Sequence, residues 1–252
     1  MSTYYAVVVF ILGTVVGSFL NVCIYRIPNE QSIAYPPSHC TNCNNYIKWY
    51  DLIPIISYIF LKGRCRHCGE KISIKYPLIE FVTGFLYLMI YIKYGIGINL
   101  LKYITFISIM IVVGMIDLET TDIYFKTTVV GVIAACVFLV IYIYMGLPIE
   151  GYVFGGLLGA GVLAIIALIT KGGMGWGDVE ICLVCGLFLG IKYTALVLFL
   201  SFIIGSIIGV LLILSGKKSR KDYVPFGPFI VIASVVTLFF GQSILNWYLY
   251  TI

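Results

Sequence analysis

Long runs of hydrophobic residues dominate the chain and predict helices that cross a membrane. A helix rises 1.5 Å per residue and needs about 20 apolar residues to span the hydrocarbon core of a bilayer. Six runs meet this requirement: Tyr4 to Tyr25, Tyr76 to Ile92, Ile98 to Ile116, Val129 to Leu147, Val153 to Thr170 and Val224 to Ile252. The first run is longer than the apolar part of a secretory signal and has no clear cleavage site, so we expect it to be retained.

A seventh run, Ile181 to Leu214, would form a helix of roughly 50 Å, which is too long for a single crossing. Gly190-Ile191-Lys192 interrupts it, and we expect a break there that leaves a short segment and a full one. The pattern therefore predicts an all-α polytopic membrane protein with about eight transmembrane helices.

Basic residues orient these spans. With eight crossings and an external N-terminus, 13 of the 16 lysine and arginine residues lie in cytoplasmic segments, as the positive-inside tendency requires. A single crossing over 181–214 would instead place the basic cluster at Lys217 to Lys221 outside. We expect a protein of the inner (cytoplasmic) membrane whose Asp117 and Asp178 both lie at cytoplasmic helix ends.

Composition agrees with a membrane protein. Hydrophobic residues make up 61% of the chain and charged residues only 11%, against about 25% in a soluble domain. The net charge of +5 comes mostly from loop residues that orient the chain. We therefore expect the lipid bilayer as a partner and no nucleic acid. The one sizeable polar region suggests three parts: a first transmembrane helix (1–25), a cytoplasmic domain (26–75) and a transmembrane domain (76–252) that carries Asp117 and Asp178.

Two Cys-x-x-Cys knuckles in the polar region predict a structural zinc site formed by Cys40, Cys43, Cys65 and Cys68. Thiols stay reduced in the cytoplasm, so zinc is favoured over two disulfides. A metal-free reduced loop and a redox pair are the alternatives. His39 and His67 lie next to cysteines of the knuckles. They are expected to contact the metal-binding cysteines or to face solvent rather than bind the metal themselves.

A further Cys-x-x-Cys spacing, at Cys182 and Cys185, lies in an apolar run. Cysteine there behaves as a small hydrophobic residue, and Cys23 and Cys136 are interpreted in the same way.

Asp117 and Asp178 are the candidate catalytic residues. Two carboxyl groups held close together share a proton, which allows one to activate water and the other to protonate a carbonyl oxygen. The glycine-rich turn Gly172 to Gly177 is expected to use positive φ angles and close backbone approach, and to place Asp178 near a helix N-terminus.

Other interpretations assign these acidic residues and the glycine turn no role in proteolysis. Many carboxylates at a membrane boundary are only solvated or cap a helix, and Glu119, Asp122 and Glu150 suit that interpretation. A phosphate-binding loop at Gly172 to Gly177 is disfavoured, because the lysine and Ser/Thr that should follow the glycines are missing.

The ordered motifs resemble the type IV prepilin peptidases, polytopic proteases of the G-x-G-D aspartyl class. The resemblance covers nearly the whole chain and is carried by the following segments: Gly17 to Pro28, Cys40 to Cys43, Trp49 to Tyr58, Arg64 to Cys68, Ile72 to Glu80, Gly114 to Glu119 and Gly173 to Asp178.

This resemblance implies cleavage of the basic leader of type IV prepilins and related pseudopilins after a glycine, on the cytoplasmic side. It also implies methylation of the new N-terminal amine with S-adenosylmethionine. No residue motif for that cofactor is evident. Glu80, in a family motif at the start of a span, is a weak candidate for a cofactor or amine contact, and a solvated interfacial glutamate is the equal alternative.

The chain departs from the family pattern at two places. Tyr124-Phe125 stands where many relatives have Pro-Asp, and Glu180 stands where they have lysine. We hypothesise that Glu180 either acts on the aspartate pair or faces another partner.

A rival from a different class is a zinc-stabilised transporter or scaffold whose aspartates bind a proton or cation. Transporter carboxylates usually lie at mid-membrane on broken helices. Those of this chain are predicted at helix ends, which favours proteolysis.

Overall fold

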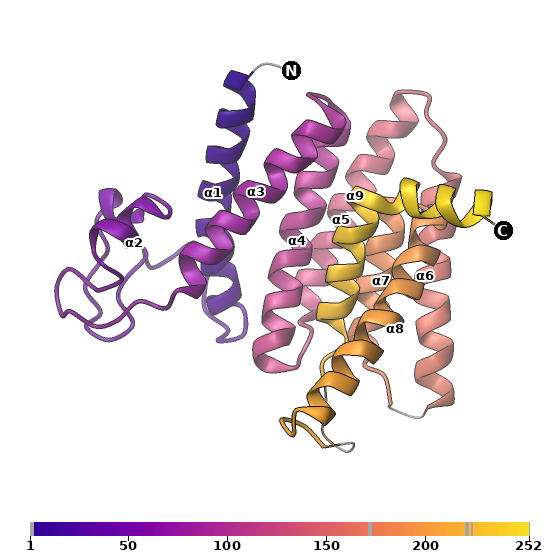
Figure 1. The fold of residues 1–252 in the computed structure, drawn as a ribbon. Helices are drawn as coiled ribbons and strands as arrows, with labels where there is room; N and C mark the ends of the chain where they lie inside the picture. Colours follow the sequence, from indigo (N-terminus) through magenta and orange to yellow (C-terminus); the bar gives the residue numbers. More distant parts are fainter. Residues whose placement is uncertain (1–2, 171–172, 220–221, 223, 252) are drawn as a thin grey trace. The chain divides into compact units, whose positions relative to one another are not determined.

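The computed structural model describes residues 3–170, 173–219, 222 and 224–251, and these residues form helices without extended strands. Figure 1 shows their course. The elements in chain order are α1 (Thr3–Arg26), the 3₁₀ helix η1 (Trp49–Leu52), α2 (Ile56–Phe60), α3 (Lys75–Tyr94), α4 (Ile98–Thr120), α5 (Phe125–Tyr144), α6 (Glu150–Ile169), α7 (Trp176–Leu189), α8 (Ile191–Leu214) and α9 (Gly227–Thr251).

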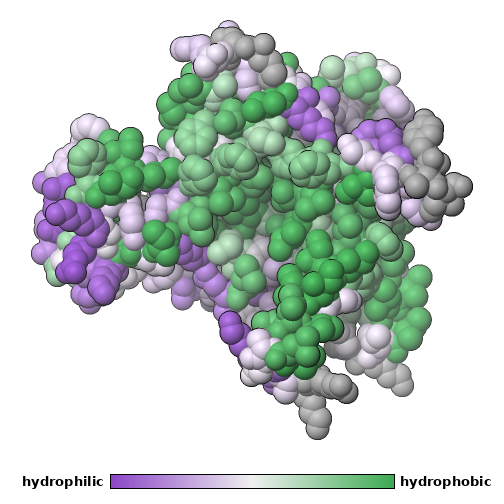
Figure 2. All heavy atoms as spheres, in the orientation of Figure 1, coloured by the Kyte–Doolittle hydropathy of each residue, from purple (hydrophilic) through white to green (hydrophobic). Residues whose placement is uncertain are grey.

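The predicted all-α membrane architecture is confirmed. Among the described residues, seven helices are long and apolar enough to cross a bilayer: α1, α3, α4, α5, α6, α8 and α9. The eighth apolar helix, α7, has 14 residues. Hydrophobic residues cover the helices, while hydrophilic residues gather over the segment between α1 and α3 (Figure 2). Such an apolar exterior suits lipid rather than water.

Gly190 separates α7 from α8, as the sequence predicted. Its φ of +84° lies in the left-handed region that favours glycine, and its N–H donates to the carbonyl of Gly186 to close α7. The long apolar run therefore becomes two helices.

The chain divides into two compact units, Met1–Val112 and Val113–Ile252. In the first unit α1 packs along α3. The Asn21 side chain on α1 donates to the carbonyl of Tyr76 on α3 at 3.0 Å. A Cβ atom at Gly17 would lie 2.8 Å from Cα of Glu80, so small residues let these helix backbones approach closely.

In the second unit α7 is the central helix and packs against α5, α6, α8 and α9. Its closest neighbour is α6, because a Cβ atom at Gly186 would overlap the backbone of Gly155 and Gly156. This backbone-to-backbone contact positions α7, and with it the candidate catalytic Asp178.

Candidate functional site

Asp117 lies one turn before the end of α4 and is buried, with 2% of its surface exposed. The backbone N–H of Gly227, the first residue of α9, hydrogen-bonds to its carboxyl group. Any side chain at position 227 would overlap Oδ2 of Asp117. The N-terminal amide groups of a helix have no partners within the helix, so the start of α9 is a suitable neighbour for a carboxylate.

Asp178 is the third residue of α7 and is equally buried, at 2% exposure. Gly175 is the N-cap residue of the helix, and its carbonyl accepts the N–H of Asp178 at 3.2 Å. The predicted position at a helix N-terminus is therefore confirmed.

The expectation of positive φ angles in the glycine turn is wrong for Gly175, which has an extended backbone with φ of −71°. Position 177 instead requires glycine because there is no room for a side chain. A Cβ atom added there would lie 2.5 Å from Cβ of Ile123, in the segment between α4 and α5. Gly172, the first residue of the predicted turn, lies outside the described residues, as does Lys171 before it.

The two aspartates lie close enough for their carboxyl groups to interact electrostatically. Oδ2 of Asp117 and the Cδ1 atom of Ile181, one turn after Asp178, both border the space beside Gly227. Among the described residues, three buried side-chain polar atoms lack a hydrogen-bond partner: Oδ2 of Asp117, Oδ1 of Asp178 and Oγ1 of Thr237. A buried polar atom without a partner costs about 1–3 kcal/mol, so the two carboxyl oxygens call for water, a shared proton or a ligand.

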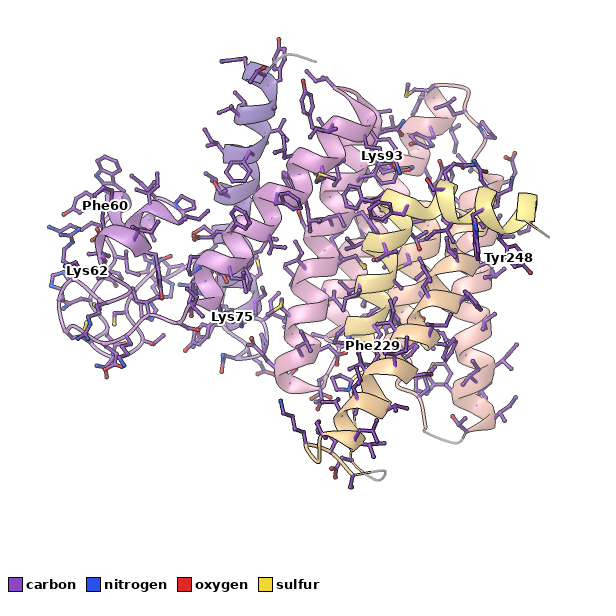
Figure 3. All side chains as sticks on the ribbon, in the orientation of Figure 1. Phe60, Lys62, Lys75, Lys93, Phe229 and Tyr248 are labelled. Atoms are coloured by element: carbon purple, nitrogen blue, oxygen red, sulfur yellow. The ribbon has the colours of Figure 1, made fainter. Side chains whose placement is uncertain are left out.

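A cavity of about 340 Å³ opens beside Asp178. Phe229, from the first turn of α9, is labelled in Figure 3 and contributes to its wall. Its lining comes from the glycine turn, α8 and the start of α9: Gly173, Met174, Gly175, Asp178, Phe202, Gly205, Ser206, Gly209, Val224, Phe226 and Phe229. The cavity therefore has a mostly apolar lining that includes one carboxyl group, that of Asp178.

Sequence reasoning missed Gly227 and the aromatic residues near it. The run Pro225-Phe226-Gly227-Pro228 carries the signal, because proline near the first turn marks a helix start. The residues of that run do not by themselves predict that Gly227 contacts Asp117.

The four knuckle cysteines come together in the first unit, as predicted. Their Sγ atoms all lie within 4.8 Å of one another, and those of Cys40 and Cys68 are 3.8 Å apart. Zinc bonded to four thiolates at about 2.3 Å holds the sulfur atoms about 3.8 Å apart. The donor set and its spacing therefore fit a tetrahedral metal ion.

The other histidine and cysteine residues lie outside this cluster. His39 directs Nδ1 to the carbonyl of Pro37 at 3.1 Å, and neither histidine joins the cluster. Cys182 and Cys185 are buried in α7, and Cys23 is buried in α1. Cys136 is exposed on α5.

An Asp51–Arg66 ion pair braces the second knuckle. Nε and Nη2 of Arg66 donate to the two carboxylate oxygens of Asp51 at 2.8 and 2.6 Å. Hydrogen bonding to Arg66 holds the pKa of Asp51 below its usual value. This pair ties the knuckle to η1 and was not foreseen from the sequence.

Glu80 borders a cavity of about 430 Å³ that lies within the first unit. It is 8% exposed, and its Oε2 accepts the N–H of Ile55 at 2.7 Å. The alternative of a solvated glutamate is therefore wrong. Ile55 has a φ of +63°, a strained value for a β-branched residue, and such strain is common at functional sites. The lining also includes the side chains of Asn21, Tyr25 and Tyr76.

Comparison with known families and proteins gives a consistent result. Residues 11–94 match the model of the bacterial peptidase A24 N-terminal domain, and residues 104–210 match that of the type IV leader peptidase family. A prepilin leader peptidase/N-methyltransferase of Bacillus subtilis (strain 168) is 35% identical over 246 residues, covering 96% of this chain and 97% of the relative. This chain belongs to the type IV leader peptidase family.

Other relatives carry the same name. Those of Aeromonas salmonicida (strain A449) and Pseudomonas putida are 31% and 28% identical, covering 98% and 96% of this chain and 95% and 92% of the relatives. No solved structure gives a significant match. Membership of the type IV leader peptidase family favours the protease over the transporter or scaffold.

One departure from the leader peptidase pattern has a structural partner. Glu180 on α7 accepts a hydrogen bond from Thr128 on α5, with 2.5 Å between Oγ1 and Oε2. Phe125 begins α5, with Tyr124 as its N-cap residue. Glu180 thus faces a neighbouring helix, in line with the second half of the hypothesis.

Proposed function

We propose that this chain is a membrane-embedded aspartyl endopeptidase that removes the leader of type IV prepilins or pseudopilins, with Asp117 and Asp178 as its catalytic pair. The names of the relatives support the substrate class. The observation that carries the catalytic assignment is that two buried carboxyl groups from different helices each keep an oxygen without a hydrogen-bond partner and lie close enough to interact electrostatically.

The chemistry follows from the pair sharing one proton. The ionised carboxylate takes a proton from a water molecule as its oxygen attacks the scissile carbonyl carbon. The protonated partner donates to the carbonyl oxygen, which gives a tetrahedral diol. The C–N bond then breaks as the nitrogen is protonated, and the free pair returns to its starting state. Burial raises the strength of these interactions because it excludes competing water.

We place this reaction on the cytoplasmic side. The distribution of lysine and arginine supports an external N-terminus, with the polar loop and both aspartates on the cytoplasmic face of the inner membrane. A substrate with a basic leader and an apolar helix would then present its junction at the level of the aspartates.

Cleavage of a purified prepilin in detergent tests the assignment. Asp117→Asn and Asp178→Asn should each abolish leader removal while the protein still folds. Glu150→Gln is the matched control, because Glu150 is an exposed carboxylate at the start of α6. Normal cleavage by either catalytic variant would refute the pair.

We also infer that the four knuckle cysteines hold a structural zinc ion. Their thiolates would neutralise the dication, and the metal would join the two knuckles in a region with few buried apolar residues.

A second activity, methylation of the new N-terminal amine, is supported by the names of the relatives and by the cavity at Glu80. Its volume is of the size that holds small cofactors. S-adenosylmethionine would supply the methyl group there. Glu80 would attract a cationic group, and Tyr25 and Tyr76 would contact an apolar or cationic part of the ligand. Calorimetry with S-adenosylmethionine should show binding that Glu80→Gln weakens, and undiminished binding would exclude this role for Glu80.

A further inference from the structure

The cavity beside Asp178 lies between α8 and the start of α9, and this part of it is called the groove below. Gly205, Ser206 and Gly209 supply its α8 wall, and Phe226 and Phe229 supply the facing wall. Figure 2 shows that hydrophobic residues dominate the surface of the helices in this unit. The lining of the groove is mostly apolar and includes the buried carboxyl group of Asp178.

The two glycines of α8 differ in what they contact. A Cβ atom at Gly205 would lie 2.9 Å from the ring of Phe229, so this glycine is already packed. At Gly209 no atom of the described residues lies within 4 Å of the Cβ position. Phe229 therefore fills the space beside Gly205, whereas the Cβ position of Gly209 is open. Small residues four positions apart on a membrane helix allow another helix to approach closely.

The membrane restricts what can fill this space. Only 22% of the apolar window of α8 is buried, the smallest share among the seven long apolar helices of the described residues. A polypeptide lying beside it in lipid must satisfy its own backbone hydrogen bonds and is therefore helical. At the end of the groove, Oδ1 of Asp178 is buried without a partner, which marks where a reacting group belongs.

We propose that this groove, defined by Gly205, Ser206, Gly209, Phe226 and Phe229, docks the apolar helix of the substrate and leads its N-terminal junction to Asp178. The inference rests on the proposed protease function and adds the surface that selects the substrate. Gly209 is the position against which the helix packs. It is a specificity-determining position rather than a catalytic residue.

Gly209→Leu is the direct test, because it adds a side chain to the groove at a position where no described atom lies within 4 Å of the Cβ. It also replaces a poor helix former with a good one, so α8 is expected to form. The matched control is Gly161→Leu on α6. Gly161 also has no described atom within 4 Å of its Cβ position, and it does not line the cavity.

Photo-crosslinking reports docking without requiring cleavage. The probe is a synthetic peptide with a basic leader, a glycine junction and an apolar helix of about 20 residues, carrying a benzophenone in the second helical turn. With the full chain bearing Asp117→Asn in detergent, mass spectrometry should locate crosslinks at residues 202–209 or 224–229. Gly209→Leu should remove them and Gly161→Leu should retain them. Crosslinks elsewhere, or undiminished crosslinks in Gly209→Leu, would overturn the proposal.

Kinetics with the same peptide separates docking from chemistry. Gly209→Leu should raise KM about tenfold or more and change kcat little, because it removes binding and not the catalytic pair. Unchanged KM with normal cleavage would refute the groove and leave the protease assignment standing. Crosslinking in the groove without any cleavage by the native chain would refute the protease and retain the docking site. A changed oligomeric state in Gly209→Leu with unchanged crosslinking would instead assign the groove to a second copy of the chain.

Discussion

Gly177 and Ile123 meet where the two aspartate-bearing segments adjoin. The missing side chain of Gly177 leaves room for Ile123, whose Cβ, Cδ1 and Cγ2 atoms would lie 2.5, 2.8 and 3.0 Å from an added Cβ. One of these residues directly precedes Asp178, and the other follows Asp117 by six positions. This contact sets how closely the segments carrying the two carboxyl groups approach.

Gly177→Ala should therefore separate Asp117 and Asp178, the proposed catalytic pair. A displacement of about 1 Å can cost about 100-fold in rate, so we expect kcat/KM for prepilin cleavage to fall by roughly that factor. The control is Gly161→Ala, which adds the same methyl group in open space. A second change identifies the cause. Ile123→Gly should restore part of the activity to Gly177→Ala, whereas Ile123→Ala should not, because alanine retains the clashing Cβ.

Gly186→Ala should destabilise the second unit. The added methyl group would strike the backbone of Gly155 and Gly156, which cannot rotate away as a side chain can. Overpacking of this kind costs about 1–3 kcal/mol. Thermal unfolding in detergent should show a lower Tm than for the native chain, while Gly161→Ala should match or exceed the native value. An unchanged Tm for Gly186→Ala would contradict the tight α6–α7 contact.

Zinc content should depend on the four knuckle cysteines alone. Cys40→Ser or Cys65→Ser should lose most of the bound metal, because serine is a poor ligand for a site of four thiolates. Cys136→Ser, which changes an exposed cysteine of α5, should keep one zinc per chain. Elemental analysis of the purified variants measures this directly. Full metal content after Cys40→Ser would exclude the site.

The Asp51–Arg66 pair should make the polar loop sensitive to acid. The pKa of Asp51 is lowered in the folded protein, so the pair contributes to stability above the usual Asp pKa of about 3.9. That contribution is lost as the pH falls through the folded-state pKa. Limited proteolysis should show that Asp51→Asn weakens loop protection by a constant factor above about pH 5, and that the difference from the native chain shrinks below about pH 4. A difference independent of pH would exclude the ionised pair.

Local sequence was sufficient for the helices and for the cluster of four cysteines. Runs of apolar residues specify membrane helices because each backbone group bonds within its own helix. Gly190 predicted the break between α7 and α8, because only glycine adopts a φ of +84° without strain. The spacing of the cysteines predicted their convergence, since four thiolates in paired knuckles match the demands of one metal ion.

The turn before Asp178 shows where local reasoning stops. Its glycines suggested unusual backbone angles, yet Gly175 is extended and Gly177 is needed because Ile123 occupies the space of its side chain. The sequence alone likewise left open whether Glu80 is solvated or buried. In the structure its carboxylate accepts a hydrogen bond from the N–H of Ile55. Both outcomes depend on residues that are distant in the chain.

The sequence by itself determined that the chain crosses a membrane with helices, that it breaks one apolar run at Gly190 and that it carries paired acidic and thiol groups. Only the tertiary structure decided that Gly227 lies against Asp117 and that Gly209 and Asp178 line one cavity. The physical reason is that helix formation depends on neighbouring residues, whereas the contacts between helices depend on side-chain shapes that meet only after the helices have packed.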